Sequence, residues 1–281
     1  MTDQAQLEFW NGAPGQAWVE LQPDLDALHA GVTELLIEAA ELTPGERVLH
    51  VGCGAGALTF AAAHEVSPGG HVTGLDISEP LLREARALAE RAELSNVDFM
   101  HGDAETRTFT PDGYHAVLSR FGMMFFEDTT AGLRNVLHAL KKDGRIAFAA
   151  WAGIDENPWF DIPARAAEER LGPAGPAQAD APGPLRFADV KRVEKMLVEA
   201  GFQDVSGDAF KVDLHHPGGL DAVRRVAARI GPVARHLRDK GGTDADREAI
   251  VEDVVERFRR YETGDGVRIP AKITLFRGRR R

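Results

Sequence analysis

The stretch of sequence that decides the fold reads Arg47-Val48-Leu49-His50-Val51-Gly52-Cys53-Gly54-Ala55-Gly56-Ala57. The apolar run before Gly52 has the length of a buried strand, and the alanine-rich residues after Gly56 favour a helix. The three alternating glycines predict a tight turn, because such a turn needs unusual dihedral angles and lets a ligand touch bare backbone. This order is typical of a nucleotide-type cofactor site, although Gly52, Gly54 and Ala57 also fit the weak dinucleotide-binding fingerprint.

A second strand, residues 71–75, follows a helix and the turn Ser67-Pro68-Gly69-Gly70, and it ends at Asp76. This position lies about twenty residues past the glycines, where an acidic residue suits a ribose because its two hydroxyls can donate to one carboxylate. The alternative for Asp76 is a helix cap or a turn residue. The pattern predicts that Asp76 and the glycine turn meet at one edge of a parallel sheet.

Further strands and helices alternate along the chain, which is typical of an α/β fold. We expect a helix over residues 79–93, strands over 97–100, 115–119 and 145–151, and a helix over 130–140. Two motifs follow the third and fourth strands, namely His101-Gly102-Asp103-Ala104-Glu105 and Arg120-Phe121-Gly122-Met123-Met124-Phe125-Phe126.

This ordered set of motifs resembles the class I S-adenosylmethionine-dependent methyltransferases, in particular the small-molecule branch that includes the ubiquinone/menaquinone C-methyltransferases (methyltransferase type 11). The resemblance covers roughly residues 45–152. It implies a Rossmann-like seven-stranded methyltransferase sheet with helices on both faces. It also implies S-adenosyl-L-methionine as cofactor and transfer of its methyl group by in-line displacement to a small-molecule acceptor.

The resemblance also implies a set of site residues. The glycines would pack against the methionine and ribose, Asp76 would take the ribose hydroxyls, and Asp103 would accept from the adenine amino group. A structural role is the alternative for Asp103 and Glu105, and an ion pair is the alternative for Arg120. The cofactor-binding residues predicted in this way are His50, Gly52, Cys53, Gly54, Gly56, Asp76, Ile77, Asp103, Ala104, Glu105, Ser119 and Arg120.

His50 departs from the family pattern, which has an acidic residue two places before the first glycine. A neutral imidazole can accept a hydrogen bond but brings no charge to the ammonium of the cofactor. We predict that His50 lies beside that ammonium, and we take His50, as a general base, and Arg120 as the candidate catalytic residues.

The segments outside this core predict a lid and a cap. The domain layout expected is an N-terminal helical lid (1–44), the cofactor-binding core (45–152), an insertion (153–187), a continuation of the core (188–216), a helical cap (217–265) and a last core strand with a tail (266–281). Within these we expect helices over residues 25–42, 157–170, 190–200, 220–240 and 244–261, strands over 204–215 and 267–277, and irregular structure over 172–184. The lid and substrate residues predicted are Trp10 and Trp18, which flank a flexible Gly/Pro turn, with Phe121, Met123, Met124, Trp151 and Trp159.

Composition limits the classes of partner. A net charge of −11 argues against nucleic acid, and the basic run after Arg277 is expected to be a solvated tail. The single cysteine, Cys53, excludes an intrachain disulfide and a cysteine-rich metal site, so we expect a packing role for it and no metal. No signal peptide or membrane-spanning run is seen, which predicts a cytoplasmic protein. The sequence leaves the oligomeric state open, with a homodimer as one alternative.

Two rival functions remain. One is an NAD(P)-dependent oxidoreductase that uses the same glycine turn, and the motif from Gly102 to Glu105 argues against it because a second acidic contact suits adenine. The other is a non-catalytic S-adenosylmethionine-binding protein, which only His50 favours.

Overall fold

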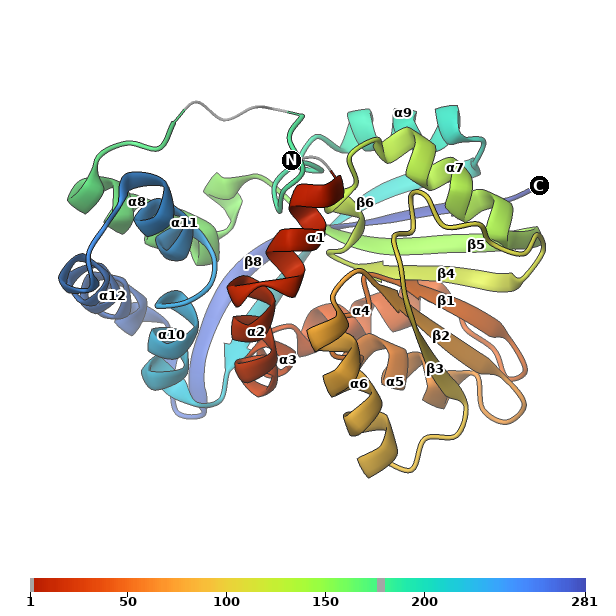
Figure 1. Cartoon of the computed structure of the whole chain (residues 1–281), viewed down its shortest axis with the longest axis horizontal. Helices are drawn as coiled ribbons and strands as arrows, with labels where there is room; N and C mark the ends of the chain where they lie inside the picture. The colour runs from red at the N-terminus through yellow and green to blue at the C-terminus, as the bar shows by residue number, and fades with distance from the viewer. Residues whose placement is uncertain (1–2, 176–179) are drawn as a thin grey trace.

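The strands form one sheet in the computed structural model, which describes residues 3–175 and 180–281 (Figure 1). In this part of the chain the strands are β1 (Arg47–Val51), β2 (His71–Asp76), β3 (Val97–His101), β4 (Tyr114–Arg120), β5 (Leu140–Trp151), β6 (Gln203–His216), β7 (Glu262–Thr263) and β8 (Gly266–Arg279). Their order is β3-β2-β1-β4-β5-β8-β6, with β7 paired to β8. The first five strands are parallel, and β8 runs antiparallel between β5 and β6. The predicted Rossmann-like sheet is confirmed, with the short β7 added.

Helices cover both faces of the sheet. Figure 1 shows α4, α5 and α6 below the sheet and α7 and α9 above it, while α1, α2 and α3 cross in front. The helices of the described residues are α1 (Asp3–Asn11), α2 (Ala13–Glu20), α3 (Gln22–Leu28), α4 (Ala30–Ala40), α5 (Ala57–Glu65), α6 (Glu79–Arg91), α7 (Thr129–Ala139), α8 (Pro158–Leu171), α9 (Val190–Ala200), α10 (Gly219–Ala227), α11 (Pro232–Lys240) and α12 (Asp244–Phe258). Three short 3₁₀ helices are η1 (Met123–Phe125), η2 (Ile154–Glu156) and η3 (Arg259–Tyr261).

Side-chain caps fix where several helices begin. Ser78, Asp128 and Asp189 each accept a hydrogen bond from the backbone N–H three residues further on, at the starts of α6, α7 and α9. Such a cap satisfies a donor that the first helical turn leaves unpaired. Gly201 ends α9 at a φ of 107°, in the left-handed conformation that favours glycine at the end of a helix.

Three element boundaries differ from the prediction. The helix expected over residues 25–42 is divided at His29 into α3 and α4. The helix expected over 220–240 is divided by Gly231, at a φ of 79°, and Pro232, which starts α11. The predicted strand 145–151 begins earlier, at Leu140, because the backbone of residues 143 and 144 pairs with Arg280 beyond the end of β8.

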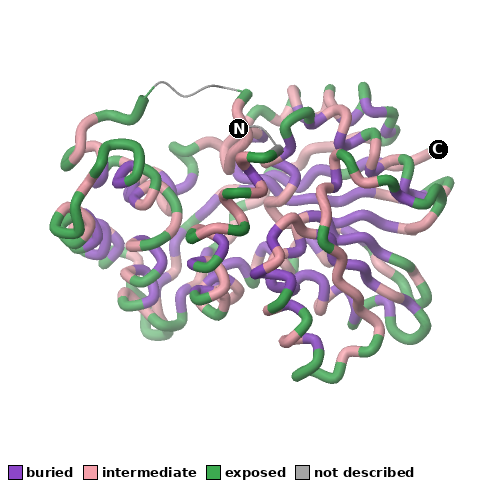
Figure 2. Tube along the Cα trace, viewed as in Figure 1, coloured by how far each residue is buried: buried purple, intermediate pink, exposed green. Residues whose placement is uncertain are grey.

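The core fills both sides of the sheet. Figure 2 shows buried residues along the central strands and exposed ones on the outer helix faces. The aromatic contact of Phe148 with Phe276, at 5.0 Å between ring centroids, joins β5 to β8, and Phe187 packs on Phe148 at 6.0 Å. The segment before α9 is therefore held against the sheet.

A second group of helices packs beside the long β6–β8 ribbon. Helices α11 and α12 pack on α8, and α10 packs on α12 and on the ribbon (Figure 1). Helices α10, α11 and α12 are those predicted as a cap, whereas α8 belongs to the predicted insertion, and the domain limits stay a prediction. Of the irregular segment predicted over residues 172–184, residues 176–179 lie outside the described residues.

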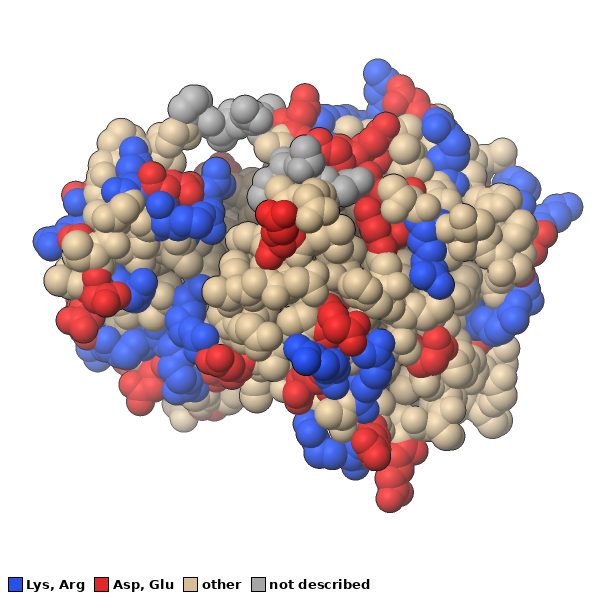
Figure 3. All heavy atoms as spheres, viewed as in Figure 1, with Lys and Arg blue, Asp and Glu red and all other residues tan. Residues whose placement is uncertain are grey.

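The surface carries mixed charges. Acidic and basic side chains are interspersed over the face seen in Figure 3. The C-terminal arginines, predicted to be a solvated tail, instead pair with carboxylates: Arg277 with Asp208 at 2.6 Å and Arg280 with Asp112 at 2.8 Å. Within residues 3–175 and 180–281, the fold contains no helix with the length and apolar character that a bilayer crossing requires.

Candidate functional site

The glycine turn joins β1 to α5 and is tied to β2. The backbone N–H groups of Gly52 and Cys53 both donate to the carbonyl of Leu75, at 2.8 and 3.1 Å. Gly52, Gly54 and Gly56 have φ angles of 69°, 54° and 97°, a region that L side chains rarely adopt. The turn is therefore bent sharply at the carboxyl end of β1, as predicted.

Each glycine has a different environment. A Cβ at Gly52 would lie 2.8 Å from the Cα of Gly122, and one at Gly56 would lie 2.7 Å from the ring of Phe60. A Cβ at Gly54 would meet nothing within 4 Å. Gly52 and Gly56 thus permit close packing, whereas Gly54 presents bare backbone to open space, where a ligand can approach.

Asp76 lies beside this open backbone. Its Oδ2 accepts a hydrogen bond from the N–H of Gly54 at 2.7 Å, and its Oδ1 accepts one from the N–H of Ser78 at 2.8 Å. Burial raises the pKa of Asp76 despite these two bonds, which favour the carboxylate. The parallel pairing of β1 with β2 thus brings together the glycine turn and Asp76, which lie far apart in the sequence.

Cys53 has the packing role predicted for it. The thiol is 5% exposed, and burial, followed by the charge of Asp76, raises its pKa well above the ordinary value. A thiol with a raised pKa has little thiolate and is a poor nucleophile. Its sulfur would lie 3.0 Å from a Cβ at Gly74, so it fills space against β2.

The N-terminal helices close over the loop after β2. The side-chain amide of Asn11 donates to the carbonyl of Ile77 at 2.8 Å, and its oxygen accepts from the N–H of Glu79 at 3.0 Å. The hydroxyl of Ser78 donates to the carbonyl of Trp10 at 2.8 Å. These bonds hold the backbone beside Ile77, the residue that is predicted to flank adenine.

The two tryptophans of the predicted lid contact each other. The rings of Trp10 and Trp18 are 5.6 Å apart, and Trp10 lies at the same distance from Phe125 in η1. The segment from Gly12 to Gly15 was predicted as a flexible turn, and this is wrong. Gly12 precedes α2, and Pro14 occupies its first turn, where a missing N–H costs no helical hydrogen bond.

The motif after β3 is mostly structural. One carboxylate oxygen of Asp103 accepts from the N–H of Glu105 at 2.9 Å. The two oxygens of Glu105 accept from the N–H groups of Glu127 and Asp128, at 2.7 and 2.8 Å. Glu105 therefore anchors the loop before α7, which is the structural role given as its alternative, and its cofactor contact stays a prediction. Ala104 is buried between these residues.

His50 is buried on the α5 face of the sheet. Its Nδ1 lies 2.8 Å from Oγ1 of Thr59 in α5, and its Nε2 has no partner within the described residues. Burial, followed by the charge of Arg120, lowers the pKa of His50 to about 3. Such an imidazole is a weak base near neutral pH, so the predicted role of His50 as a general base is not supported.

Ser119 and Arg120 end β4 beside the glycine turn. Ser119 is fully buried, and its hydroxyl accepts from the N–H of Gly122 at 3.2 Å. The guanidinium of Arg120 donates to Oγ1 of Thr33 at 2.6 Å and lies 3.6 Å from Oδ1 of Asp26. The ion pair considered as an alternative for Arg120 is thus present, and its partner comes from α3.

An aromatic group lies at the ends of β4 and β5. Phe121 stacks on Trp151 with 4.2 Å between centroids and 9° between ring planes, and His29 contacts both rings at 5.5 and 5.9 Å. Trp159 of α8 lies 5.3 Å from His216 at the end of β6. This places three of the predicted substrate residues, Phe121, Trp151 and Trp159, among buried histidines.

Met123 and Met124 do not line an open space. Each is 1% exposed and belongs to the main core, which corrects their prediction as a flexible pocket lining. Methionine fills irregular core gaps because its side chain is unbranched and adaptable.

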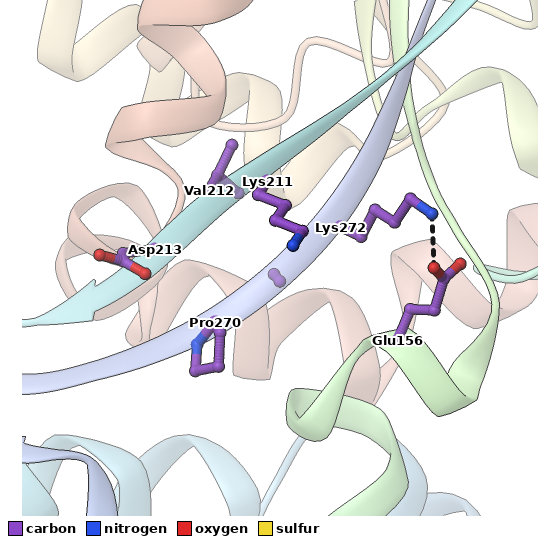
Figure 4. A pocket seen from close by; sticks show the side chains of 7 residues that line it. Glu156, Lys211, Val212, Asp213, Pro270 and Lys272 are labelled. Carbon is purple, nitrogen blue, oxygen red and sulfur yellow. Dashed lines mark hydrogen bonds and ion pairs between the residues drawn. The ribbon is translucent and has the colours of Figure 1, made fainter.

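A hollow of about 470 Å³ lies along the β6–β8 ribbon (Figure 4). Lys211 and Lys272 are direct cross-strand partners there, and Lys272 pairs with Glu156 of η2 at 2.5 Å. The carbonyl of Lys272 accepts from the N–H of Ala152, next to the end of β5. The hollow therefore borders the edge of the sheet at which the glycine turn lies. Its lining is Glu156, Lys211, Val212, Asp213, Pro270, Ala271 and Lys272.

Several residues at this edge carry no sequence signal. Asn11, Asp26 and Thr33 reach it from helices that precede the glycine motif, and His216 reaches it from β6. Polar residues in helices are too common to be singled out by type, and only the packing of these helices brings them to the site. In the part of the chain that the structure covers, no three His, Cys, Asp or Glu side chains gather as around a metal ion.

Comparison with known proteins identifies the family and the relatives that this chain resembles. A family profile described as a methyltransferase domain matches residues 42–200. Aklanonic acid methyltransferase DauC of Streptomyces sp. (strain C5) is 37% identical over 115 residues, 41% of this chain and 52% of that protein. Demethylmenaquinone methyltransferase of Listeria monocytogenes is 33% identical over 120 residues, 43% of this chain and 51% of that protein. The chain spans about half the length of the curated relatives it matches.

A solved structure shares the fold. Phosphoethanolamine N-methyltransferase 2 of Haemonchus contortus, in complex with phosphomonomethylethanolamine and S-adenosylhomocysteine, superposes with a TM-score of 0.55 at 16% identity. The superposition covers 89% of this chain and 52% of that one. At this identity the likeness concerns the fold alone.

Proposed function

This chain belongs to the methyltransferase domain family, and from that membership we propose that it transfers the methyl group of S-adenosylmethionine to a small-molecule acceptor. The single observation that carries the proposal is the pairing of Asp76 with the open backbone of Gly54 at the carboxyl edge of the sheet. Ligands of open α/β sheets bind at this edge. The relatives named above are methyltransferases of small molecules, and the Haemonchus protein holds the demethylated cofactor.

The residues present fit the adenosine part of this cofactor. Gly54 leaves room for the ligand against its backbone, and Asp76 offers a carboxylate that can accept from both ribose hydroxyls. We assign the ribose to Asp76, the adenine amino group to Asp103 and a flanking contact to Ile77. Because Asn11 and Trp10 are bonded to the loop after Asp76, the N-terminal helices would cover the bound nucleoside.

The cofactor supplies an electrophilic methyl on a sulfonium. The work left to this chain is to hold an acceptor in line with that methyl and to exclude water. The half-buried Phe121, which stacks on the buried Trp151, lies with the half-buried Trp159 where β4 and β5 end and suits a planar or apolar acceptor. Ser119 and Arg120 lie between this aromatic group and the glycine turn.

The buried histidines nearby are poor bases. Burial is the main cause that lowers the pKa of His29 well below its usual value, that of His50 to about 3 and that of His216 to about 4. The proposal therefore assigns no base to these three residues. The acceptor would present a nucleophile that is ionised already, as a carboxylate or an acidic hydroxyl is at neutral pH.

Calorimetry tests the proposal against its rivals. We expect binding of S-adenosylmethionine and S-adenosylhomocysteine and none of NAD or NADP. Tight binding of NAD without a response to S-adenosylmethionine would establish the oxidoreductase. Release of S-adenosylhomocysteine with a panel of aromatic acids and hydroxylated acceptors, against the same compounds without enzyme, then separates an enzyme from a non-catalytic binding protein.

A further inference from the structure

The methionine end of S-adenosylmethionine carries an ammonium and a carboxylate side by side. A protein that holds such a group needs an acceptor and a donor of opposite charge close together, because charge-assisted hydrogen bonds are the strong ones. The adenosine contacts proposed above leave this end unassigned. The inference that follows rests on the proposed function and concerns the residues that hold it.

Arg120 lies where a donor to the carboxylate of the methionine end is needed. In the parallel register of β1 and β4, His50 pairs with Leu118, so Arg120, two residues later, faces the same side of the sheet and lies nearer its carboxyl edge. Gly122, two residues further on, packs directly on Gly52. Arg120 is therefore the strand-end cation beside the glycine turn.

Asp26 supplies the opposite charge. Its Oδ1 lies 3.6 Å from Nη2 of Arg120, and the two side chains are 28% and 15% exposed. This distance exceeds the roughly 2.7–2.9 Å of a charge-assisted hydrogen bond, so the pair can take a ligand without first losing a short bond. Thr33 of α4 holds the guanidinium from the other side at 2.6 Å.

Besides Asp26, the titratable side chains of the described residues that interact electrostatically with Arg120 are two buried histidines, and both are neutral. His29 and His50 interact electrostatically with it, and burial lowers the pKa of both. The strand β1 thus brings no charge to this point through His50. The carboxylate paired with the strand-end cation comes instead from α3, which precedes the glycine motif in the chain.

We propose that Asp26 and Arg120 together bind the methionine end of S-adenosylmethionine, Asp26 accepting from its ammonium and Arg120 donating to its carboxylate. Thr33 is a positioning residue that orients the guanidinium. The N-terminal helices are then part of the cofactor site and not only a cover over it.

Calorimetry with three ligands isolates this contact. S-adenosylmethionine and S-adenosylhomocysteine contain the amino-acid end, whereas 5′-methylthioadenosine keeps the adenosine and lacks it. Asp26→Asn should weaken binding of the first two by about tenfold to a hundredfold, the loss of one hydrogen bond between charged groups, and leave 5′-methylthioadenosine unchanged. Thr33→Val should act in the same direction with a smaller loss.

Asp24→Asn is the matched control. Asp24 lies on the same helix and pairs with Arg225 at 2.8 Å, away from Arg120, so its loss should leave all three affinities unchanged. Far-ultraviolet circular dichroism of each variant establishes that it is folded, and Thr33→Val carries the test if Asp26→Asn does not fold.

Equal losses for all three ligands, or no loss for any, would overturn the assignment of Asp26 and Arg120 while leaving the proposed function in place. A wild-type chain that binds 5′-methylthioadenosine as tightly as S-adenosylhomocysteine would also overturn it. Failure of the wild type to bind any of the three would overturn the proposed function and this inference with it.

Discussion

At the scale of single residues, burial decides which side chains can carry charge at the site. Burial raises the pKa of Asp76, and the hydrogen bonds from the backbone N–H groups of Gly54 and Ser78 counter part of this rise because they favour the carboxylate. His50 has a single neutral partner, Thr59, and burial keeps its imidazole uncharged. Burial thus opposes the charged form of both side chains, and at Asp76 the two backbone donors act in the other direction.

Substitution of Asp76 by alanine should weaken the binding of S-adenosylmethionine by about 1.5–3 kcal/mol, the size of hydrogen bonds to a charged acceptor. The affinity for 5′-methylthioadenosine should fall equally, because both ligands contain the ribose. Asp98→Ala is the control, since Asp98 bonds Thr73 and His71 within β2 and β3. Calorimetry that shows equal losses in the two variants would refute the assignment of the ribose to Asp76.

His50 should make the fold sensitive to acid. Its pKa is about 3 in the folded chain and near the ordinary 6.5 when unfolded, so between these values the unfolded chain binds a proton that the folded chain does not. The free energy of unfolding should therefore be highest above pH 6.5 and fall on acidification, by up to about 1.4 kcal/mol per pH unit for this group.

Urea unfolding of the wild type and of His50→Asn at pH 7.5 and pH 5.0 measures this slope. The variant should show the smaller loss between the two pH values. An unchanged slope would mean that His50 is not buried as a neutral group. The change in affinity for S-adenosylmethionine between pH 7.5 and pH 5.0 should be the same in the wild type and in His50→Asn, because the imidazole of the folded chain remains neutral at both pH values.

At the scale of elements, the N-terminal helices act as a unit with the loop after β2. Three hydrogen bonds from Asn11 and Ser78 join α1 to that loop, and Trp10 reaches across to Phe125 after β4. Closure of the site thus depends on contacts from both sides of the glycine turn. Asn11 bonds the carbonyl of Ile77 and the N–H of Glu79, which lie just after Asp76 in the chain. The position of α1 is therefore coupled to the proposed ribose site.

Deletion of residues 1–20 should abolish turnover while the sheet stays folded, because α2 packs on α6, α1 packs on α2, and neither helix contributes a strand. Asn11→Ala should have a milder effect, with faster proteolysis near α1 and a change in tryptophan fluorescence that S-adenosylhomocysteine reverses. Formation of S-adenosylhomocysteine and circular dichroism are the two measurements. Full activity of the truncated chain would show that these helices are not a functional lid.

At the scale of the whole molecule, the antiparallel β8 holds the two halves of the chain together. It lies between β5 of the glycine-turn half and β6, and the stacked Phe148 and Phe276 pack at that junction. The other ends of β6 and β8 carry α10, and through it the helices that pack on α8. The proposed acceptor residues Trp151 and Trp159, and His216 beside Trp159, therefore come from elements that this junction aligns.

Phe148→Ala should destabilise the whole fold by about 3–5 kcal/mol, because it removes a fully buried ring and leaves a cavity between β5 and β8. The urea midpoint should fall in a single transition for the sheet and the outer helices. Val198→Ala, at a side chain that is 60% exposed on α9, should change stability by less than about 0.5 kcal/mol. Two separated transitions in the Phe148 variant would show that the halves unfold independently.

The local sequence determined the backbone features of the site that neighbouring residues in the chain control. The glycine turn and the acid at the end of β2 follow from spacing, because a strand that passes into a helix through glycines has few other conformations, whereas the Rossmann-like sheet was implied by the family resemblance. The division of α10 from α11 also depends on local residue types, because Gly231 has a positive φ and Pro232 starts a new helix.

The tertiary structure alone decided which side chains meet. Nothing near Arg120 in the sequence indicates Asp26 or Thr33, since they lie on helices that precede the glycine motif and reach β4 only by packing. Met123 and Met124 could be assigned to a pocket or to the core from residue type, and burial placed them in the core. The sequence of this protein by itself determined the backbone that receives a cofactor, whereas the partners of each charge depend on long-range packing, which no local pattern encodes.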